Sequence, residues 1–229
     1  CLFDNCRTKQ GSAVYMQADG IVRNCRMINC TASDSNRGYT GTVTLTKGMV
    51  ENCIITNNTA TITMANTTCP GAAGVNIRGG TVRNCLVADN LAKNGLSGSV
   101  AGGVYLYKGT VESCTVCQNS INTPTYPGQG LLMVDGTLRN TIVAYNGEDG
   151  VFKDPVNFER SVDVGTVEYS CTYPPAAGGG NLGTDPLFDA EKGTGQLLAA
   201  SDCVNAGTNQ DWMVGAKDAF GNPRIYGEI

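Results

Sequence analysis

Apolar residues alternate with polar residues over short stretches of this chain, and glycine or asparagine ends each stretch. In one example, Val104 and Leu106 fall on one face of an extended segment, and Lys108-Gly109 follows as a turn. Beyond the turn, Val111 points inward and Glu112 points outward. Alternation with a period of two is typical of β-strands, and glycine and asparagine favour the turns between them. The pattern therefore predicts many short strands and no long helix.

The stretches recur as a repeat, which reads Gly-x-Val/Leu-Arg/Glu-Asn-Cys in its clearest copies. The copies begin at Gly20, Gly48, Gly80, Gly109, Gly136 and Gly165, at spacings of 28, 32, 29, 27 and 29 residues. A leucine-rich repeat would need leucine at fixed positions and a shorter period. We predict an all-β fold, a right-handed parallel β-helix of about 29 residues and three strands per coil. Residues 1–180 are expected to form the coils, and residues 181–229 a closing segment packed on the last coil.

Equivalent residues of successive coils are expected to stack about 4.8 Å apart and to form columns. One inward column is Cys1, Cys25, Cys53, Cys85, Cys114 and Thr141. A second column is Cys6, Cys30, Asn58, Asn90, Asn119 and Asn146, and a third is Asn24, Asn52, Asn84 and Asn140, interrupted by Ser113. Asparagine suits bends because its amide bonds to nearby backbone and it tolerates left-handed geometry.

One outward column alternates in sign, and every neighbour within it carries the opposite charge. Its members are Arg23, Glu51, Arg83, Glu112, Arg139 and Glu168. Opposite charges on neighbouring strands contribute roughly 0.2–1 kcal/mol per pair, whereas like charges repel. We interpret this column as a structural feature that favours the predicted register.

The repeated motif resembles the right-handed parallel β-helix proteins of the pectin-lyase-like superfamily. The segments 183–188, 201–208 and 218–225 resemble the choice-of-anchor Q domain of bacterial surface proteins. The resemblance implies a secreted or cell-surface protein that acts as a scaffold, adhesin or glycan-binding module. It is fairly specific for the fold and less so for activity, because this fold carries lyases, hydrolases, adhesins and phage spikes. The chain begins inside a repeat, so we expect it to be part of a longer chain.

Composition narrows the possible functions. The chain has no histidine, which excludes histidine-based catalytic triads and histidine metal sites. Its net charge is −4 and it has no basic stripe, which argues against nucleic acid as a partner. No apolar run approaches the roughly 18 residues of a transmembrane segment. We expect no cofactor and no bound metal.

The segments that vary in length all follow the second column and precede the next coil. They are 31–41, 59–74, 91–103, 120–130 and 147–165. Insertions at one position of a solenoid repeat collect on one edge, which is often the binding side. The predicted ligand-binding residues there are Asp34, Arg37, Tyr39, Tyr126 and Asp149, because aromatic rings beside polar groups suit sugars. The alternative is that these tyrosines only cover loop backbone. The expected partner is a polysaccharide or a host or cell-surface glycan.

The alternative function is a polysaccharide lyase or a glycoside hydrolase that acts on an acidic polysaccharide. Glycoside hydrolysis needs two carboxylates on either side of the scissile bond. No carboxylate column is present, so we predict no catalytic residues. If the protein is an enzyme, the candidates are Lys153, Asp154 and Arg160, in the longest loop.

Eleven cysteines are too many to pair completely, so at least one is free or bonded to another chain. We expect the inward column to be reduced, because parallel side chains stacked at strand spacing suit packing better than disulfide geometry. Cys69, Cys117, Cys171 and Cys203 are better disulfide candidates, with the pairing open. We expect Trp212, the single tryptophan, to cover the open end of the last coil.

Overall fold

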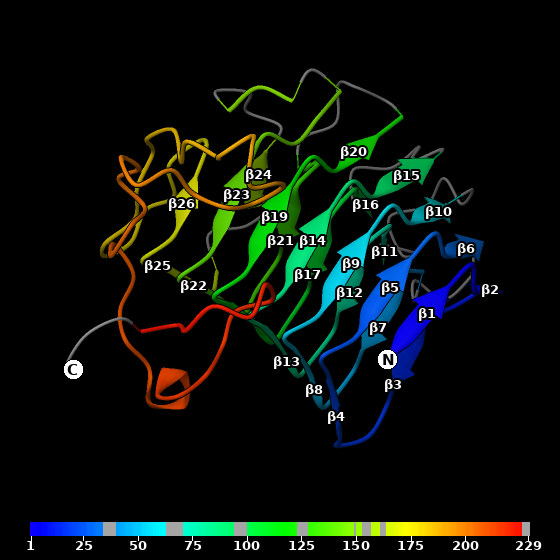
Figure 1. The fold of residues 1–229 in the computed structure, drawn as a ribbon. Helices are drawn as coiled ribbons and strands as arrows, with labels where there is room; N and C mark the ends of the chain where they lie inside the picture. The colour runs from blue at the N-terminus through cyan, green and yellow to red at the C-terminus, as the bar shows by residue number, and fades with distance from the viewer. Residues whose placement is uncertain are drawn as a thin grey trace.

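The chain forms an all-β parallel solenoid, as the repeat predicts, with about 29 residues between stacked strands (Figure 1). The computed structural model describes residues 1–33, 40–62, 71–93, 100–122, 128–148, 150–152, 157–160 and 164–225. Every strand pair in the described residues is parallel, so each turn of the chain stacks on the one before it. The observed pairs join motif copies in register, for example Thr81 with Thr110 and Val82 with Val111.

Four stacks of short strands form the walls, and two further strands pair beside them. The stack called sheet A is β1 (Leu2–Asp4), β5 (Arg26–Ile28), β9 (Ile54–Thr56), β14 (Leu86–Ala88), β19 (Thr115–Cys117), β23 (Ile142–Ala144) and β26 (Cys171–Thr172). Sheet B is β2 (Arg7–Thr8), β6 (Thr31–Ser33), β10 (Thr59–Thr61), β15 (Leu91–Lys93) and β20 (Ser120–Ile121). Sheet C is β3 (Val14–Met16), β7 (Val43–Leu45), β12 (Val75–Ile77), β17 (Val104–Leu106), β21 (Leu131–Met133) and β24 (Phe158–Arg160). Sheet D is β4 (Ile21–Arg23), β8 (Met49–Glu51), β13 (Thr81–Arg83), β18 (Thr110–Glu112), β22 (Thr137–Arg139) and β25 (Thr166–Glu168). The remaining pair is β11 (Gly71–Ala72) with β16 (Val100–Ala101), and the single-turn 3-10 helix η1 is Asp211–Met213.

Sheet B is the part of the coil that the sequence analysis does not predict. The three predicted strands of a coil correspond to sheets C, D and A. The structure adds a fourth strand, in residues expected to belong to the variable segments. These strands are two or three residues long and carry small inward residues such as Ala32, Ala60 and Ala92. Such short stretches offer too little alternation to be recognised in the sequence.

The apolar core fills the inside of the solenoid. Val82, Val111 and Leu138 of sheet D are fully or almost fully buried, as are their counterparts in sheets A and C. From the second copy of the motif onward, the backbone requires the glycine that opens it. Gly109 has φ of +121°, and a Cβ there would lie 2.5 Å from the carbonyl oxygen of Gly80 in the coil below. Only glycine combines this conformation with such close stacking.

The inner asparagine column, Asn58, Asn90, Asn119 and Asn146, occupies the corner between sheets A and B and is buried. Each Oδ1 accepts the backbone N–H of the preceding member, as in the 3.1 Å bond from Asn90 to Asn119. Each Nδ2 donates to a carbonyl of an earlier coil, as Asn119 does to Val87 at 2.9 Å. Asn157 continues the column beyond its predicted end, because its Oδ1 accepts the N–H of Asn146.

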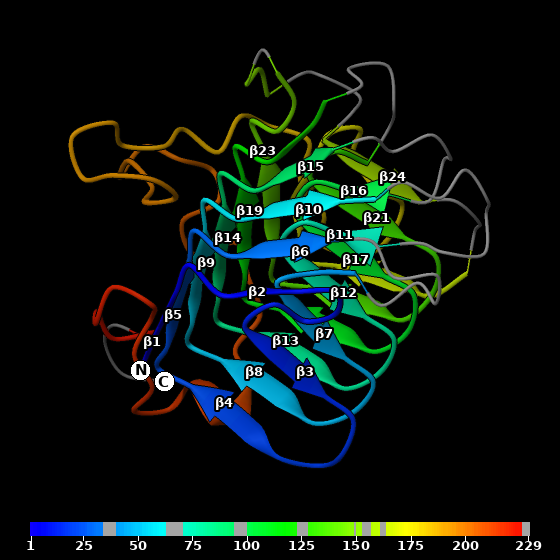
Figure 2. The ribbon, with the colours of Figure 1, turned by 90° about the vertical axis from the view of Figure 1, so that its right-hand side faces the viewer.

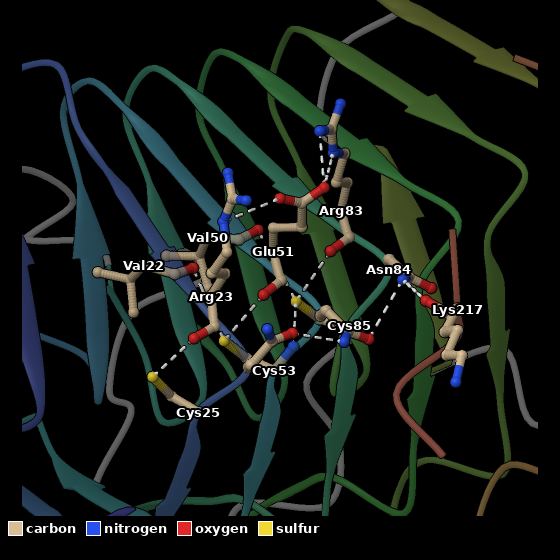
Figure 3. A network of polar contacts seen from close by, with 12 residues as sticks. Val22, Arg23, Cys25, Val50, Glu51, Cys53, Arg83, Asn84, Cys85 and Lys217 are labelled. Atoms are coloured by element: carbon tan, nitrogen blue, oxygen red, sulfur yellow. Dashed lines mark hydrogen bonds and ion pairs between the residues drawn. The ribbon is translucent and has the colours of Figure 1, made fainter. Parts of the chain in front are cut away.

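The outer asparagine column, Asn24, Asn52, Asn84 and Asn140 with Ser113 in the middle, occupies the corner between sheets D and A. All five residues have φ between 50° and 56°, which is the left-handed region that asparagine tolerates. Their side chains point away from the core, and Asn52 donates to Asn24 at 2.7 Å. The residue after each corner belongs to the inward cysteine column. In this column the Cys85 thiol donates to the carbonyl of Arg83, two residues earlier, at 3.1 Å (Figure 3).

The charge column lies on sheet D in the predicted register. Arg83 bonds to Glu51 at 2.6 Å, and Arg23 lies 3.7 Å from the same carboxylate (Figure 3). Arg139 pairs with Glu112 at 2.6 Å. The Glu112 side chain is only 7% exposed, so this pair is more deeply buried than the pairs at the ends of the column.

The closing segment is described over residues 181–225. It begins on the last coil and then runs back along the side of the solenoid (Figure 1). Leu182 pairs with Cys171 of β26, and the Phe188 ring lies 5.1 Å from that of Tyr145. Further along, the Asn84 amide donates to the Lys217 carbonyl at 2.6 Å. The segment covers outward-facing apolar residues of sheet A, including Leu86 and Cys117. Without the segment these side chains would be exposed to solvent, because the alternating pattern places them on the outer face.

Candidate functional site

The predicted ligand-binding residues cannot be placed, because Asp34, Arg37, Tyr39, Tyr126 and Asp149 lie outside the described residues. The same holds for two of the residues considered for catalysis, Lys153 and Asp154. Only Arg160 is described. Its guanidinium donates to the carbonyls of Val164 at 3.2 Å and Gly165 at 2.6 Å, so it holds the backbone that leads into β25.

The edge on which these residues were predicted is nevertheless defined by the strands around it. The connections 34–42, 62–74, 94–103 and 122–130 each leave a strand of sheet B and return to a strand of sheet C. In contrast, sheets C and D are joined by short turns such as 107–109. These four connections therefore begin and end between the same two stacks, whereas the connection 145–157 leads from sheet A to sheet C. We call this side of the molecule the B–C edge.

Beside the B–C edge, the outer face of sheet C carries aromatic and polar side chains that the prediction did not include. Tyr107 follows β17 and is 45% exposed. Its ring stacks on that of Tyr105, with centroids 6.5 Å apart and planes 20° from parallel. The Arg78 guanidinium carbon lies 5.4 Å from the Tyr107 centroid. Another tyrosine of the same face, Tyr15, lies three coils away in the register and accepts a hydrogen bond from Gln17 at 2.8 Å.

The two stacked tyrosines differ in burial, so one supports the other and only one can contact a ligand. Tyr105 is only 3% exposed, and burial raises the pKa of its phenol to about 12, with the nearby Arg78 charge acting in the opposite direction. Its hydroxyl therefore stays protonated at neutral pH. Tyr107 is held from one side by Tyr105 and Arg78 and remains open to solvent. Outward tyrosines in an alternating strand are a signal that a sequence search could have used.

A second candidate region is a cavity of about 490 Å³ between the closing segment and the corner that carries the outer asparagine column. Two asparagines fix the closing segment on either side of it. Asn84 donates to the Lys217 carbonyl, and Asn140 exchanges two 2.8 Å hydrogen bonds with the backbone of Thr208. Between them lies Ser113, whose shorter side chain leaves the space open. Figure 2 shows the closing segment on the side of the solenoid opposite sheet C.

The sequence predicts that Trp212 covers the open end of the last coil, and this prediction is wrong. Its ring lies 4.7 Å from the Arg83 guanidinium on the side of sheet D, and the Arg224 guanidinium lies 6.0 Å from the same ring. The indole is therefore in contact with two cations from distant parts of the chain. The expectation failed because the outer asparagines direct the closing segment backwards over earlier coils.

The cysteines in the described residues are all free thiols, including the four buried members of the inward column that were expected to be reduced. Of the disulfide candidates, Cys69 lies outside the described residues and Cys117 is buried beneath the closing segment. Cys203 packs against Cys171 of the last coil. Hydrogen bonding between these two thiols lowers the pKa of Cys203 and raises that of Cys171, whose burial raises it further.

Among the described residues, no three acidic, cysteine or histidine side chains are grouped as ligands for a metal ion. In the same part of the chain, no helix has the length and apolar character of a membrane span.

Comparison with known proteins gives no match to any family model, any curated protein or any solved structure. The parallel β-solenoid therefore stands on the sequence repeat and the structure alone.

Proposed function

We propose that the protein is a carbohydrate-binding module of a secreted or surface-displayed bacterial protein, which holds a glycan along the B–C edge without cleaving it. The observation that supports this most is the solvent-exposed ring of Tyr107, which Tyr105 and Arg78 hold on the rigid face next to that edge. An aromatic ring offers an apolar face to a sugar, and neighbouring polar groups fix its orientation.

The geometry of the solenoid suits an extended polymer. Successive strands of sheet C repeat about every 4.8 Å, so side chains are held at fixed intervals along one direction. Tyr15, Thr44, Asn76 and Tyr105 follow one another in register on the outer face. Thr44, Asn76 and Tyr105 are buried there, whereas Tyr15 and the adjoining Tyr107 are accessible. A surface that is already ordered lowers the entropic cost of holding a linear chain. The resemblance of the closing segment to that of surface-anchored β-helices agrees with display outside the cell.

Affinity gel electrophoresis with pectin, alginate and glycosaminoglycans tests this proposal. We expect at least one polymer to retard the protein, Tyr107→Ala to weaken the retardation, and Tyr107→Phe to keep most of it because the ring remains. Ile21→Ala removes an exposed apolar side chain from sheet D and serves as the matched control. Equal retardation of Tyr107→Ala and the unmodified chain would contradict the proposed surface.

The same samples address the alternative, a polysaccharide lyase or glycoside hydrolase. A binding module leaves the polymers intact, so we expect neither new reducing ends nor the absorbance of unsaturated uronates. Cleavage that Lys153→Ala, Asp154→Ala or Arg160→Ala abolishes would overturn the binding-module proposal in favour of the enzyme.

A further inference from the structure

Two polar groups that line the cavity beneath the closing segment make no hydrogen bond within the described residues. Ser113 is only 6% exposed, and its hydroxyl makes no hydrogen bond within the described residues. Arg224 is partly buried, and no described residue accepts a hydrogen bond from its guanidinium; its Nε is buried as well. Buried groups of this kind normally have a partner, so each one needs an explanation.

The position of Ser113 explains why the space exists. The outer asparagine column holds the closing segment at Asn84 and Asn140, and Ser113 lies between these two attachment points. An asparagine at this position would reach toward the closing segment as its neighbours do. The serine instead leaves a cavity whose lining also includes Arg224.

The charges around the cavity leave one cation available for binding. Lys192 lines the cavity and pairs with Asp189 at 3.2 Å. Asp218 also lines it. Its carboxylate accepts N–H groups from Phe220 and Asn222 and forms no ion pair with Arg224, although its charge acts to raise the pKa of the Arg224 guanidinium. Burial lowers the pKa of Arg224, but not enough for a guanidinium to lose its charge at neutral pH.

We propose that this cavity binds a small organic monocarboxylate, with the carboxylate on Arg224 and the organic part against Leu86, Ile142 and Met213. A guanidinium presents paired N–H donors that match the two oxygens of a carboxylate. One available cation matches one negative charge, and a cavity of about 490 Å³ has room for more than a bare ion. This site is separate from the glycan surface, since the closing segment that covers it and sheet C lie on opposite sides of the solenoid (Figure 2).

Trp212 provides a direct measurement, because it is the single tryptophan and its ring lies beside the Arg224 guanidinium. We would titrate the protein with sodium butyrate at constant ionic strength and follow its tryptophan fluorescence. Butyramide has a similar size and no charge, and inorganic phosphate is the competing oxyanion. We expect a saturable change with butyrate, and a response at least about tenfold weaker with butyramide, because a hydrogen bond to a charged group is lost.

Variants locate the site. Arg224→Gln and Ser113→Asn should each weaken butyrate binding, the first by removing the charge and the second by narrowing the cavity. Arg26→Gln, which changes an exposed arginine on β5, should bind as the unmodified chain does. Circular dichroism would verify folding, and Arg224→Lys would replace Arg224→Gln if the latter fails to fold. The proposal would be overturned by an equal response to butyramide, by tighter binding of phosphate, or by the absence of a saturable response. It would also be overturned if the Arg224 variant and Ser113→Asn both bound butyrate as the unmodified chain does.

Discussion

The inner and outer asparagine columns stand in neighbouring corners of the same coils, yet they hold different parts of the molecule together. Inner members such as Asn119 are fully buried, and their amides bond to the backbone of the coils above and below. Outer members lie in left-handed corners, and the amides of two of them, Asn84 and Asn140, reach the closing segment. The inner column stabilises the stacking of coils, whereas the outer column positions a segment far away in sequence. One residue type in one repeat therefore serves two purposes, according to the direction in which its side chain points.

The largest effect should follow from breaking the inner column. Asn119→Ala leaves the buried N–H of Asn90 and the carbonyl of Val87 without their partners. Each unsatisfied buried group costs about 1–3 kcal/mol, so we expect a loss of roughly 3–5 kcal/mol in the free energy of unfolding. Urea denaturation would measure it. Asn52→Gly in the outer column keeps the left-handed corner and should cost less than about 1 kcal/mol. Similar losses for the two variants would contradict the distinction.

The charge column offers a second contrast, between its buried and its exposed pairs. Glu112→Arg places a third arginine between Arg83 and Arg139 and removes the 2.6 Å pair with Arg139. Breaking a buried pair typically costs about 3–5 kcal/mol, and the partial exposure of Arg139 places this variant near 3 kcal/mol. The same change at the end of the column, Glu168→Arg, breaks a 3.7 Å pair between more exposed groups and should cost under about 1 kcal/mol. Melting temperatures at low salt would compare them, and an unchanged value for Glu112→Arg would contradict the role of the column.

The sequence predicted the features that are satisfied within the repeat and missed those that depend on distant segments. The motif glycines, the charge column and the inner asparagines each interact with the same position in the next coil, so the repeat alone reveals them. Asn157 takes its place in the inner column from outside the motif, and the strands of sheet B are too short to show alternation. The cavity depends on contacts between residues 84–140 and 208–224, which no local pattern encodes.

A smaller effect should come from restoring the interrupted outer column. Ser113→Asn places a residue that tolerates the left-handed corner between Asn84 and Asn140, where the cavity has room for it. We expect the free energy of unfolding to change by no more than about 0.5 kcal/mol, in the stabilising direction. Ser113→Ala is the matched control and should be nearly neutral, because serine and alanine carry the same Cβ strain at φ of 53° and the removed hydroxyl makes no hydrogen bond within the described residues. If Ser113→Asn were strongly destabilising, the serine would be required for packing rather than for an open cavity.

Cysteine thiols also differ between the stacked coils and the closing segment, and this difference affects their reactivity rather than the stability of the fold. Cys117 is buried, and burial raises the pKa of its thiol, so alkylating reagents should reach it only after unfolding. Cys203 is partly exposed, and the thiol of Cys171 bonds to it and lowers its pKa, so it should form the reactive thiolate at lower pH than an ordinary cysteine. Short pulses of iodoacetamide at increasing pH, followed by peptide mass spectrometry, would measure the labelling of each cysteine. We expect the Cys203 profile to rise at a lower pH than that of glutathione in the same tube, and to move toward it in Cys171→Ala, which removes the hydrogen bond. Labelling of Cys203 with the glutathione profile in the unmodified chain would show that the closing segment does not hold the two thiols together.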